Sequence, residues 1–349
     1  MRNLAIVDLG SNSARMAVSR LHANGHAEEI RRVKEDTRLS EAMGPEHILQ
    51  PAAIERTIKA LLNFRRLYER MPNTDVIGIT TAAVRMAKNQ RAFLNQVKQE
   101  VGLDLKVLSG DDEAYYDYLG VANSLVIHDC LILDTGGASC ELILVKNGCK
   151  QQLISLPFGA VTLSEQFELD DVVPSDSLFR AQMFLRNRLA DVWWLTEAMH
   201  YPIILLGGAN RTLARINRRR QKKLKVEDIH GYRLKTETVY YTFLDLLTRS
   251  KQGRQDISGM EYDRADIIVG GMLPLVTLLQ MLDSDRVIFS ESGVREGIIS
   301  EHLNSENWTL RWEWYHDCGF PPFLSKNVGR TNRHCSGTGP VNVGWTSPV

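Results

Sequence analysis

The stretch Leu131–Leu142 combines acidic side chains with a glycine turn. An apolar run ends at Asp134, two glycines and small polar residues follow, and Glu141 precedes a second apolar run. Consecutive glycines let the backbone turn sharply and expose N–H groups, which form a concave nest for an anion. The pattern predicts a strand, a tight turn and a strand, with a phosphate in the turn and its cation on Asp134 and Glu141. A plain hairpin has the same local pattern, so this stretch alone does not decide between them.

A second copy of the pattern lies near the start of the chain. Leu4–Val7 leads into Asp8 and the turn Gly10–Ser13, and another apolar run follows. An Asn-Gly pair, which is a strong hairpin signal, comes after each copy, at Asn24–Gly25 and at Asn147–Gly148. The chain is therefore predicted to contain two related units. Their phosphate turns face each other if the units pack as pseudo-symmetric domains.

Further polar groups follow two other predicted strands. The apolar run Val76–Ile79 is followed by Thr81, and Arg85 comes four residues later. Because strand ends of this kind often supply a loop to a cleft, Arg85 is a candidate phosphate clamp, with an ordinary surface arginine as the alternative. A later apolar strand leads into Gly207 and Gly208 at a helix start. This arrangement predicts a third anion-binding turn.

The predicted strand Leu105–Leu108 ends in a cluster of acidic residues that opens a helix. Ser109 or Asp111 can cap this helix, and the helix dipole favours the negative charges of Asp111 and Asp112 at its start. Capping therefore accounts for both aspartates without a functional role.

Composition limits the classes of function. The chain has 349 residues, enough for two domains, and its 42 Lys and Arg balance 42 Asp and Glu. Nothing global therefore indicates binding to nucleic acid or to an anionic membrane. The five cysteines show no CxxC spacing, and no apolar run approaches the ~18 residues of a membrane span. We expect a cytoplasmic protein whose cysteines are free thiols rather than disulfides or zinc ligands. A homodimer is one possible oligomeric state.

Two segments have both a structural and a functional interpretation. A long helix is predicted from Ser175 to about His200, and packing explains its Trp193 and Trp194 more readily than ligand binding does. The basic run Arg218–Lys223 is either a solvated helix end or a patch for an extended polyanion, and the sequence leaves both open.

The order of these motifs resembles a known family. Two phosphate hairpins that face each other across a cleft are typical of the actin, Hsp70 and sugar kinase superfamily. Within it, the chain is similar to the exopolyphosphatase and guanosine pentaphosphate phosphohydrolase (Ppx/GppA) family from residue 3 to about residue 303. The matching segments are Thr81–Asn89, Ser109–Ala114, Leu156–Val161, Arg264–Asp266 and Ser290–Gly297.

The resemblance implies an α/β fold of two ribonuclease H-like domains, residues 1–122 and 123–303, with a cleft between them and the last helix free to pack on the first domain. It implies a Mg²⁺-dependent hydrolase that releases terminal phosphate from inorganic polyphosphate or pppGpp. Glu113 matches the general base of the family, and Asp134 and Glu141, with Asp8 through water, are the metal candidates. The candidate phosphate-binding residues are Gly10, Ser11, Asn12, Ser13, Thr81, Arg85, Gly136, Gly137, Ala138, Ser139, Gly207 and Gly208.

Three positions depart from the family pattern. Ala138 stands where a third glycine is usual, Cys140 where threonine or serine is common, and Asn210 where threonine is common. If position 138 needs a positive φ, alanine costs about 1 kcal/mol and distorts the nest, and Ala138→Gly would raise activity. A small-molecule kinase of the same superfamily and a non-catalytic phosphate or nucleotide sensor are the alternatives.

Residues 304–349 do not resemble the family. Four of the six tryptophans lie there with no clean period, whereas longer family members continue into a helical domain. Disorder, an added binding segment and a shifted reading frame are the alternatives for this tail.

Overall fold

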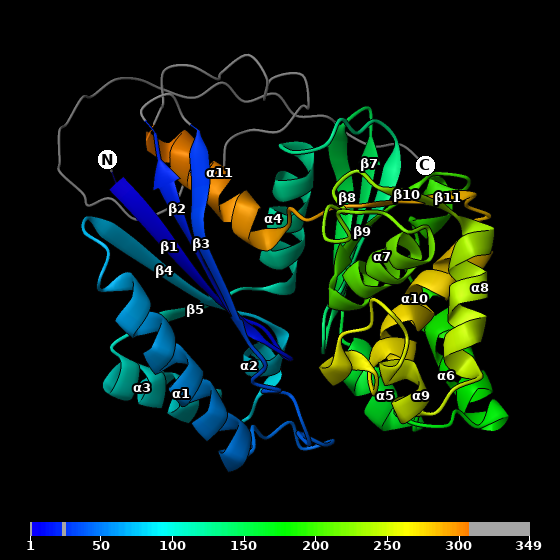
Figure 1. The fold of residues 1–349 in the computed structure, drawn as a ribbon, viewed down its shortest axis with the longest axis horizontal. Helices are drawn as coiled ribbons and strands as arrows, with labels where there is room; N and C mark the ends of the chain where they lie inside the picture. Colours follow the sequence, from blue (N-terminus) through cyan, green and yellow to red (C-terminus); the bar gives the residue numbers. More distant parts are fainter. Residues whose placement is uncertain (1, 23–25, 307–349) are drawn as a thin grey trace, which may run out of the picture. The chain divides into compact units, whose positions relative to one another are not determined.

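The computed structural model describes residues 2–22 and 26–306. The first part of the chain forms a five-stranded sheet with the order β3-β2-β1-β4-β5 (Figure 1). Strands β1 to β3 make an antiparallel meander, and β4 and β5 extend the sheet parallel to β1. The strands are β1 Arg2–Leu9, β2 Ala14–Leu21, β3 Ala27–Glu35, β4 Thr74–Thr80 and β5 Leu105–Val107.

A second sheet, with six strands in the described residues, has the order β10-β11-β9-β6-β7-β8. Strands β6 to β8 again form an antiparallel meander, and β9 and β11 extend it parallel to β6. Both sheets thus begin with the same arrangement, which agrees with the prediction of two related units. The strands are β6 Cys130–Thr135, β7 Cys140–Lys146, β8 Cys149–Leu156, β9 Ile203–Gly207, β10 Arg233–Lys235 and β11 Arg286–Phe289.

Alternating side chains give the first sheet two buried faces. Ala5 and Val7 of β1 lie in the core formed with α1 and α3, whereas Leu4 and Ile6 lie in the core formed with α4 and α11. Figure 1 shows these helix pairs on opposite faces of the sheet. The helices are α1 Pro51–Tyr68, α2 Ala82–Met86, α3 Gln90–Val101, α4 Gly110–Ala122 and α11 Val294–Glu306.

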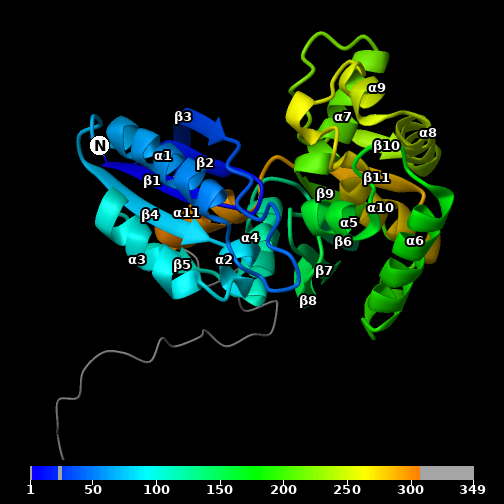
Figure 2. The same cartoon turned by 90° about the horizontal axis from the view of Figure 1, so that it is seen from below.

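Helix α4 packs against both sheets. Its Tyr116 and Leu119 belong to the core of the first sheet, and its Ala114 and Val121 belong to a core with β6, β7 and β9 of the second sheet. Figures 1 and 2 both show α4 between the two sheets. Helix α4 therefore packs against both halves of the described chain.

The other face of the second sheet is covered by helices that lie between its strands in the chain. Leu131, Leu133 and Leu142 lie in this core together with apolar residues from α5 to α8 and α10. The helices are α5 Ala160–Phe167, α6 Ser175–Ala190, α7 Gly208–Arg220, α8 Thr236–Leu247, α9 Lys251–Gln255 and α10 Ile268–Met281, with the 3₁₀ turns Leu195–Ala198 and Tyr262–Arg264.

The predicted helix from Ser175 to His200 is too long. Helix α6 ends at Ala190, because the chain turns at Asp191 and brings Trp194 into the core, where it is 3% exposed. Trp193 is 73% exposed, so the packing role predicted for it is wrong.

The cysteine and hairpin predictions had mixed outcomes. Cys130 and Cys140 are buried free thiols, as predicted. Cys149 is disulfide-bonded; it lies at the partly exposed start of β8 rather than in the core, so the expectation of a free thiol is wrong there. Asn147 and Gly148 adopt the positive φ of the predicted hairpin, 53° and 75°. The pair Asn24–Gly25 and the tail from residue 307 lie outside the described residues.

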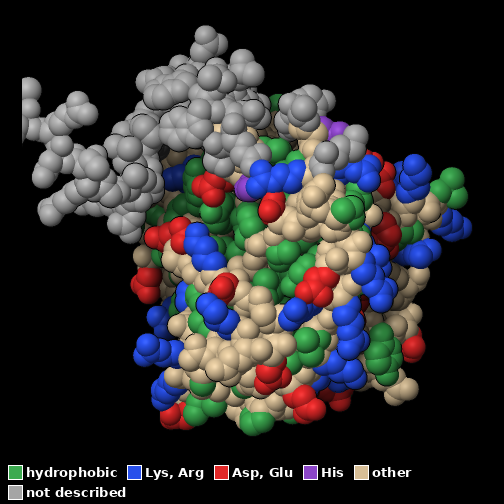
Figure 3. Space-filling view, turned by 90° about the vertical axis from the view of Figure 1, so that its left-hand side faces the viewer, with side chains coloured by type: hydrophobic (Ala, Val, Ile, Leu, Met, Phe, Trp, Pro, Cys, Tyr) green, Lys and Arg blue, Asp and Glu red, His purple; other side chains and the backbone are tan. Residues whose placement is uncertain are grey.

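The surface carries charge of both signs. Figure 3 shows Lys and Arg side chains interspersed with Asp and Glu around hydrophobic side chains, in agreement with the zero net charge. No helix within residues 2–22 and 26–306 is both long and apolar enough to cross a bilayer.

Helices α4 and α11 approach each other through glycines. A Cβ atom on Gly120 would overlap the carbonyl oxygen of Gly293, and one on Gly297 would overlap the carbonyl oxygen of Tyr116. Neither position has room for a side chain, so glycine is required by close packing at both.

We predict that Gly297→Ala lowers the free energy of unfolding by about 1–3 kcal/mol, because the new methyl group forces α11 away from α4. Urea unfolding measures the change. Gly253→Ala in α9 is the matched control, since the nearest atom to its Cβ would be 3.4 Å away. Equal stabilities of Gly297→Ala and the parent protein would contradict the prediction.

Candidate active site

The two predicted phosphate turns have the same backbone structure. The turn between β1 and β2 is closed by a hydrogen bond from Gly10 N to Ser13 O of 3.1 Å, and the turn between β6 and β7 by one from Gly136 N to Ser139 O of 3.0 Å. The strand registers also correspond: Asp8 pairs with Arg15 in the first hairpin, as Asp134 pairs with Glu141 in the second. Equivalent positions therefore carry an arginine in one half and a glutamate in the other.

The two turns touch. A Cβ atom on Gly137 would lie 2.9 Å from the Cβ of Ser11, so glycine at 137 permits the close approach of the turns. The sequence predicts that these glycines supply the conformational freedom for a sharp turn. Neither Gly136 nor Gly137 has a positive φ, so that reason does not apply.

Ala138 fits the turn without strain. Its φ is not positive and its side chain is 1% exposed, packed in the protein interior. The condition under which alanine would distort the nest is not met, so the expected gain from Ala138→Gly is withdrawn.

A cleft of about 120 Å³ lies at the turns. Most of the residues predicted from the sequence line it, but Arg85, Ala138 and Glu141 do not. Groups not predicted from the sequence also line it, chiefly four arginines and Asp117. The predicted residues in the lining are Asp8, Gly10, Ser11, Asn12, Ser13, Thr81, Glu113, Asp134, Gly136, Gly137, Ser139, Gly207 and Gly208.

Glu113 is positioned by the first turn of α4. Ser109 and Asp112 form a capping box that fixes the start of this helix, and Glu113 follows with 9% exposure. Burial raises the pKa of the Glu113 carboxyl to about 7, although the nearby Arg85 lowers it in part. The result is a carboxyl group that can gain or lose a proton near neutral pH.

Arg85 holds Glu113 in place. Its Nη1 donates hydrogen bonds to Glu113 Oε2 at 3.0 Å and to the carbonyl oxygen of Leu108 at 2.9 Å. Arg85 itself does not line the cleft. The structure therefore gives it a carboxylate partner, and its role as a phosphate clamp stays a prediction.

Carboxyl groups gather on one side of Glu113. Asp117, one helical turn later, is 0% exposed, and neither of its oxygens has a hydrogen-bond partner; Asp134 Oδ1 is likewise buried and unpaired. Glu141 accepts a 2.7 Å hydrogen bond from Ser155 Oγ. Burial raises the pKa of Asp117 and Glu141 well above the usual range and that of Asp134 to about 6. Helical spacing from Glu113 is the signal that could have identified Asp117.

Four arginines line the same cleft: Arg15, Arg211, Arg264 and Arg295. Burial, reinforced by the neighbouring arginines, lowers the pKa of Arg15 to about 10 and that of Arg211 well below its usual value. Arg264 and Arg295 lie in the family-like segments Arg264–Asp266 and Ser290–Gly297, whereas no local pattern in the sequence distinguishes Arg15 and Arg211 from surface arginines.

The carboxyl groups suit a hard cation. Their oxygens are the donors that Mg²⁺ prefers, and both oxygens of Asp117 and Oδ1 of Asp134 have no hydrogen-bond partner in the described part of the chain. No three acidic, His or Cys side chains in residues 2–22 and 26–306 are close enough to chelate a metal by themselves. Such a site leaves coordination positions for water and for the oxygens of a phosphate, as Mg²⁺ sites commonly do.

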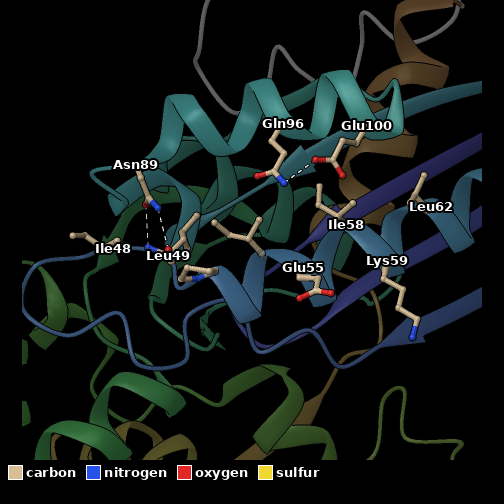
Figure 4. Close-up of a pocket in the computed structure, with 11 residues that line it drawn as sticks. Ile48, Leu49, Glu55, Ile58, Lys59, Leu62, Asn89, Gln96 and Glu100 are labelled. Atoms are coloured by element: carbon tan, nitrogen blue, oxygen red, sulfur yellow. Dashed lines mark hydrogen bonds between the residues drawn. The ribbon is translucent and has the colours of Figure 1, made fainter.

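A larger groove lies on the first sheet's outer helices, between α1 and α3 (Figure 4). It has a volume of about 570 Å³, and Ile54, Ile58 and Leu62 of α1 contribute apolar surface to it. Its charged lining residues are Glu55, Lys59 and Glu100, it includes none of the predicted site residues, and nothing in the structure shows what covers it. The small charged cleft at the turns is therefore the candidate active site.

The basic run is partly structural. Arg218 lies over the ring of Tyr232, 5.2 Å from its centroid, and donates to the carbonyl oxygen of Lys225 at 2.7 Å. Arg220 pairs with Asp245. Arg219, Lys222 and Lys223 are exposed at the C-terminal end of α7. Because α7 has 13 residues, this end lies about 20 Å from the helix start at the cleft.

Solved structures share this fold. One from an Aquifex aeolicus member of the Ppx/GppA family is 29% identical, with a TM-score of 0.72 over 88% of this chain and 99% of that chain. An exopolyphosphatase structure from Cytophaga hutchinsonii is 22% identical, with a TM-score of 0.82 over 87% and 98%. The protein thus has the two-domain α/β actin-like fold, and the predicted fold class is confirmed.

A family model places the chain more narrowly. The model of the Ppx/GppA phosphatase family matches residues 18–306. The chain therefore belongs to the Ppx/GppA phosphatase family.

Curated relatives vary in length. A bifunctional 3-dehydroquinate synthase/phosphatase of Fusobacterium nucleatum is 26% identical over 86% of this chain and 47% of its own length. A putative exopolyphosphatase of Haemophilus influenzae is 26% identical over 86% and 91%. A guanosine-5'-triphosphate,3'-diphosphate pyrophosphatase of Pseudoalteromonas translucida is 27% identical over 86% and 59%. The chain spans about half the length of the first of these relatives.

We predict that Gly137→Ala separates the two turns, because its Cβ would lie only 2.9 Å from that of Ser11. Affinity for inorganic pyrophosphate, measured by calorimetry with Mg²⁺, should fall at least about tenfold, as expected when one or more charge-assisted hydrogen bonds are lost. Ala138→Gly is the matched control, and its affinity should stay within about twofold, a change below 0.5 kcal/mol. A similar loss in both variants would show that the turn needs backbone stiffness rather than the close contact.

Proposed function

We propose that the protein hydrolyses terminal phosphoanhydride bonds of inorganic polyphosphate, pppGpp or both, with Mg²⁺ and with Glu113 as the general base. The observation that carries this proposal is the position of Glu113: a buried carboxyl group with a pKa of about 7 lines the same cleft as two facing phosphate turns. A base with this pKa is half ionised near neutral pH, where general-base catalysis is most effective.

In this proposal, the two phosphate turns bind the terminal phosphoryl group. The Gly10 and Gly136 N–H groups close the turns, so the backbone N–H groups of residues 11–13 and 137–139 are the ones that would donate to phosphoryl oxygens. The buried arginines of the cleft add positive charge. Donors fixed in advance stabilise the charge that develops on the phosphoryl oxygens during transfer.

Asp134 and Asp117 are the cleft carboxylates that would hold Mg²⁺, with Asp8 through water and Glu141 behind Asp134. Mg²⁺ supplies charge neutralisation and alignment of the phosphate when it is bound. The unpaired buried oxygens of Asp117 and Asp134 support this assignment. Glu141 is hydrogen-bonded to Ser155 and does not line the cleft, so it would support its cross-strand neighbour Asp134 rather than contact the metal.

Glu113 takes the proton of the attacking water. The water oxygen bonds to the terminal phosphorus as the bridging P–O bond breaks, and the electron pair of that bond leaves with the shortened chain. The water proton passes to Glu113, which releases it to solvent before the next turnover. Arg85 keeps the carboxylate oriented and favours its charged form.

The relatives support this class of reaction. They include proteins named exopolyphosphatase and guanosine-5'-triphosphate,3'-diphosphate pyrophosphatase. The direct test is phosphate release from long-chain polyphosphate, pppGpp and ATP, assayed side by side with Mg²⁺. Phosphate appearing on an added alcohol acceptor instead of in solution would indicate a kinase and overturn the proposal.

We predict that Glu113→Gln lowers turnover at least about a hundredfold while substrate binding persists, as expected for loss of a general base. Single-turnover phosphate release and calorimetric binding separate the two effects. Asp111→Asn is the matched control, because Asp111 is exposed two residues earlier on the same helix; its turnover should be unchanged. Normal turnover in Glu113→Gln would remove this residue from the mechanism.

We predict that Arg85→Met moves the acid limb of the pH–rate profile to higher pH. Activity requires the ionised carboxylate, so it should rise as pH increases through about 7 in the parent protein. Loss of the neighbouring positive charge raises the pKa of Glu113 further, and the limb should move up by about one pH unit or more.

Arg85→Lys keeps the charge and serves as the control for this prediction. The measurement is kcat/KM between pH 5.5 and pH 9, and activity of Arg85→Met should recover at the alkaline end. An activity loss of the same size at every pH would show that Arg85 supports the fold rather than the ionisation of Glu113.

A further inference from the structure

Helix α6 has one face that no other described element covers. Its core face, which includes Ala181, Leu185 and Leu189, packs in the core of the second sheet with α5 and α10. The opposite face carries Phe179, which is 62% exposed, and Met183, which is 44% exposed. Figures 1 and 2 both show α6 at the outer edge of this half of the molecule. Two large apolar side chains are therefore in solvent on adjacent turns of one helix.

These two residues belong to a longer row of exposed residues, which we call the α6 seam. From the first turn of the helix onwards, its members are separated by three or four residues, so they share one side of the helix. This spacing is typical of residues through which one helix packs along another. The α6 seam consists of Val172, just before the helix, and Asp176, Phe179, Met183, Arg186 and Ala190.

The α6 seam is self-complementary about the level of Ala181. Phe179 and Met183 lie two residues on either side of Ala181. Asp176 and Arg186 lie five residues on either side of it. A two-fold axis at this level would bring a second copy of α6 into antiparallel contact with the first. Each aromatic ring would then face a methionine of the other copy, and each aspartate would face an arginine.

The flanking positions match in the same way. Val172 and Ala190 lie nine residues on either side of Ala181, so an apolar side chain would face another apolar side chain. Ser175 and Asn187 lie six residues on either side, and both are exposed polar residues that can hydrogen-bond with each other. None of the facing pairs brings two like charges together.

The charges of the α6 seam are available to a second copy. Arg186 is exposed and takes part in no ion pair within the described ranges. Asp176 pairs with Arg180 of its own helix at 3.5 Å, but its side chain is 75% exposed. Because an exposed pair of this kind contributes little, Asp176 can also pair with an arginine of the second copy. Arg188 lies over the ring of Phe184, outside the seam.

We propose that the α6 seam is the contact between two copies of this chain, packed antiparallel about a two-fold axis. Phe179 and Met183 form its apolar centre, where a thioether beside an aromatic ring adds a favourable contact. Asp176 and Arg186 close both ends and fix the direction of the helices. Since one pair of helices buries less surface than a standard interface, we expect a dissociation constant of about 1–100 µM. The cleft lining contains no residue of α6, so this inference does not depend on the proposed function.

The first test is sedimentation equilibrium of the full chain at concentrations up to about 500 µM. Phe179→Ser removes the aromatic side chain from the centre of the seam and should raise the dissociation constant of the dimer at least about tenfold. Tyr241→Ser removes another exposed aromatic side chain, on α8, and is the matched control. Its dissociation constant should stay within about twofold of the parent value. A parent protein that stays monomeric, or a Phe179→Ser variant that dimerises like the parent, would overturn the proposal.

The second test exchanges the charges. Asp176→Lys puts a lysine opposite each Arg186, and Arg186→Glu puts a glutamate opposite each Asp176. Each variant alone should therefore dimerise at least about fivefold more weakly than the parent protein. In a mixed dimer of the two variants every charge faces its opposite, so an equimolar mixture should recover the parent affinity. These differences should shrink in concentrated salt, which screens exposed charges.

Arg188→Glu is the matched control for this exchange. It makes the same charge change on the same helix outside the seam, so its dimer affinity should be normal. Misfolded variants could not restore each other, so recovery in the mixture also shows that both exchanged variants are folded. A mixture that associates no better than either variant alone would overturn the antiparallel packing. Equal losses in Arg186→Glu and Arg188→Glu would overturn it too.

Discussion

The burial of α4 on two sides is the constraint on which the cleft depends. Ala114 and Val121 pack on the second sheet while Tyr116 and Leu119 pack on the first, so this helix cannot rotate without breaking one core. A polar stripe lies between these two apolar surfaces, and it carries Glu113 and, one turn later, Asp117. Close packing of apolar side chains thereby fixes the positions of both carboxyl groups relative to the two turns.

Backbone contact extends this constraint to Arg295. Gly297 lets α11 approach the carbonyl oxygen of Tyr116 on α4. Arg295 lies in the first turn of α11, so its guanidinium is held by the same helix pair that holds Glu113. The positions of opposite charges in the cleft therefore depend on helix packing, although no direct bond joins them.

The sequence predicted the parts of the site that have a local pattern. Asp8 with Gly10 and Asp134 with Gly136 were found because an apolar run, a carboxylate and a small turn are adjacent in the chain. Arg15 and Arg211 were missed because an arginine that lines a cleft looks the same in sequence as one in solvent. The contact of Arg85 with Glu113 could not be predicted for a related reason: the two residues are 28 positions apart, and only the tertiary fold brings them together.

Desolvation acts on the cleft in two directions at once. It raises the pKa values of Glu113, Asp117, Asp134 and Glu141, and it lowers those of Arg15 and Arg211. Both pKa shifts favour the neutral forms of these groups. An ion pair between a carboxylate and an arginine opposes both shifts, because each charge stabilises the other. The cleft contains part of this compensation, since Arg264 pairs with Glu261 and Arg295 Nη2 lies 3.8 Å from Glu296 Oε1. Asp117 keeps both oxygens without a hydrogen bond. A cation bound to a phosphate group would present positive charge to such carboxylates and negative charge to the arginines, as the proposed function requires.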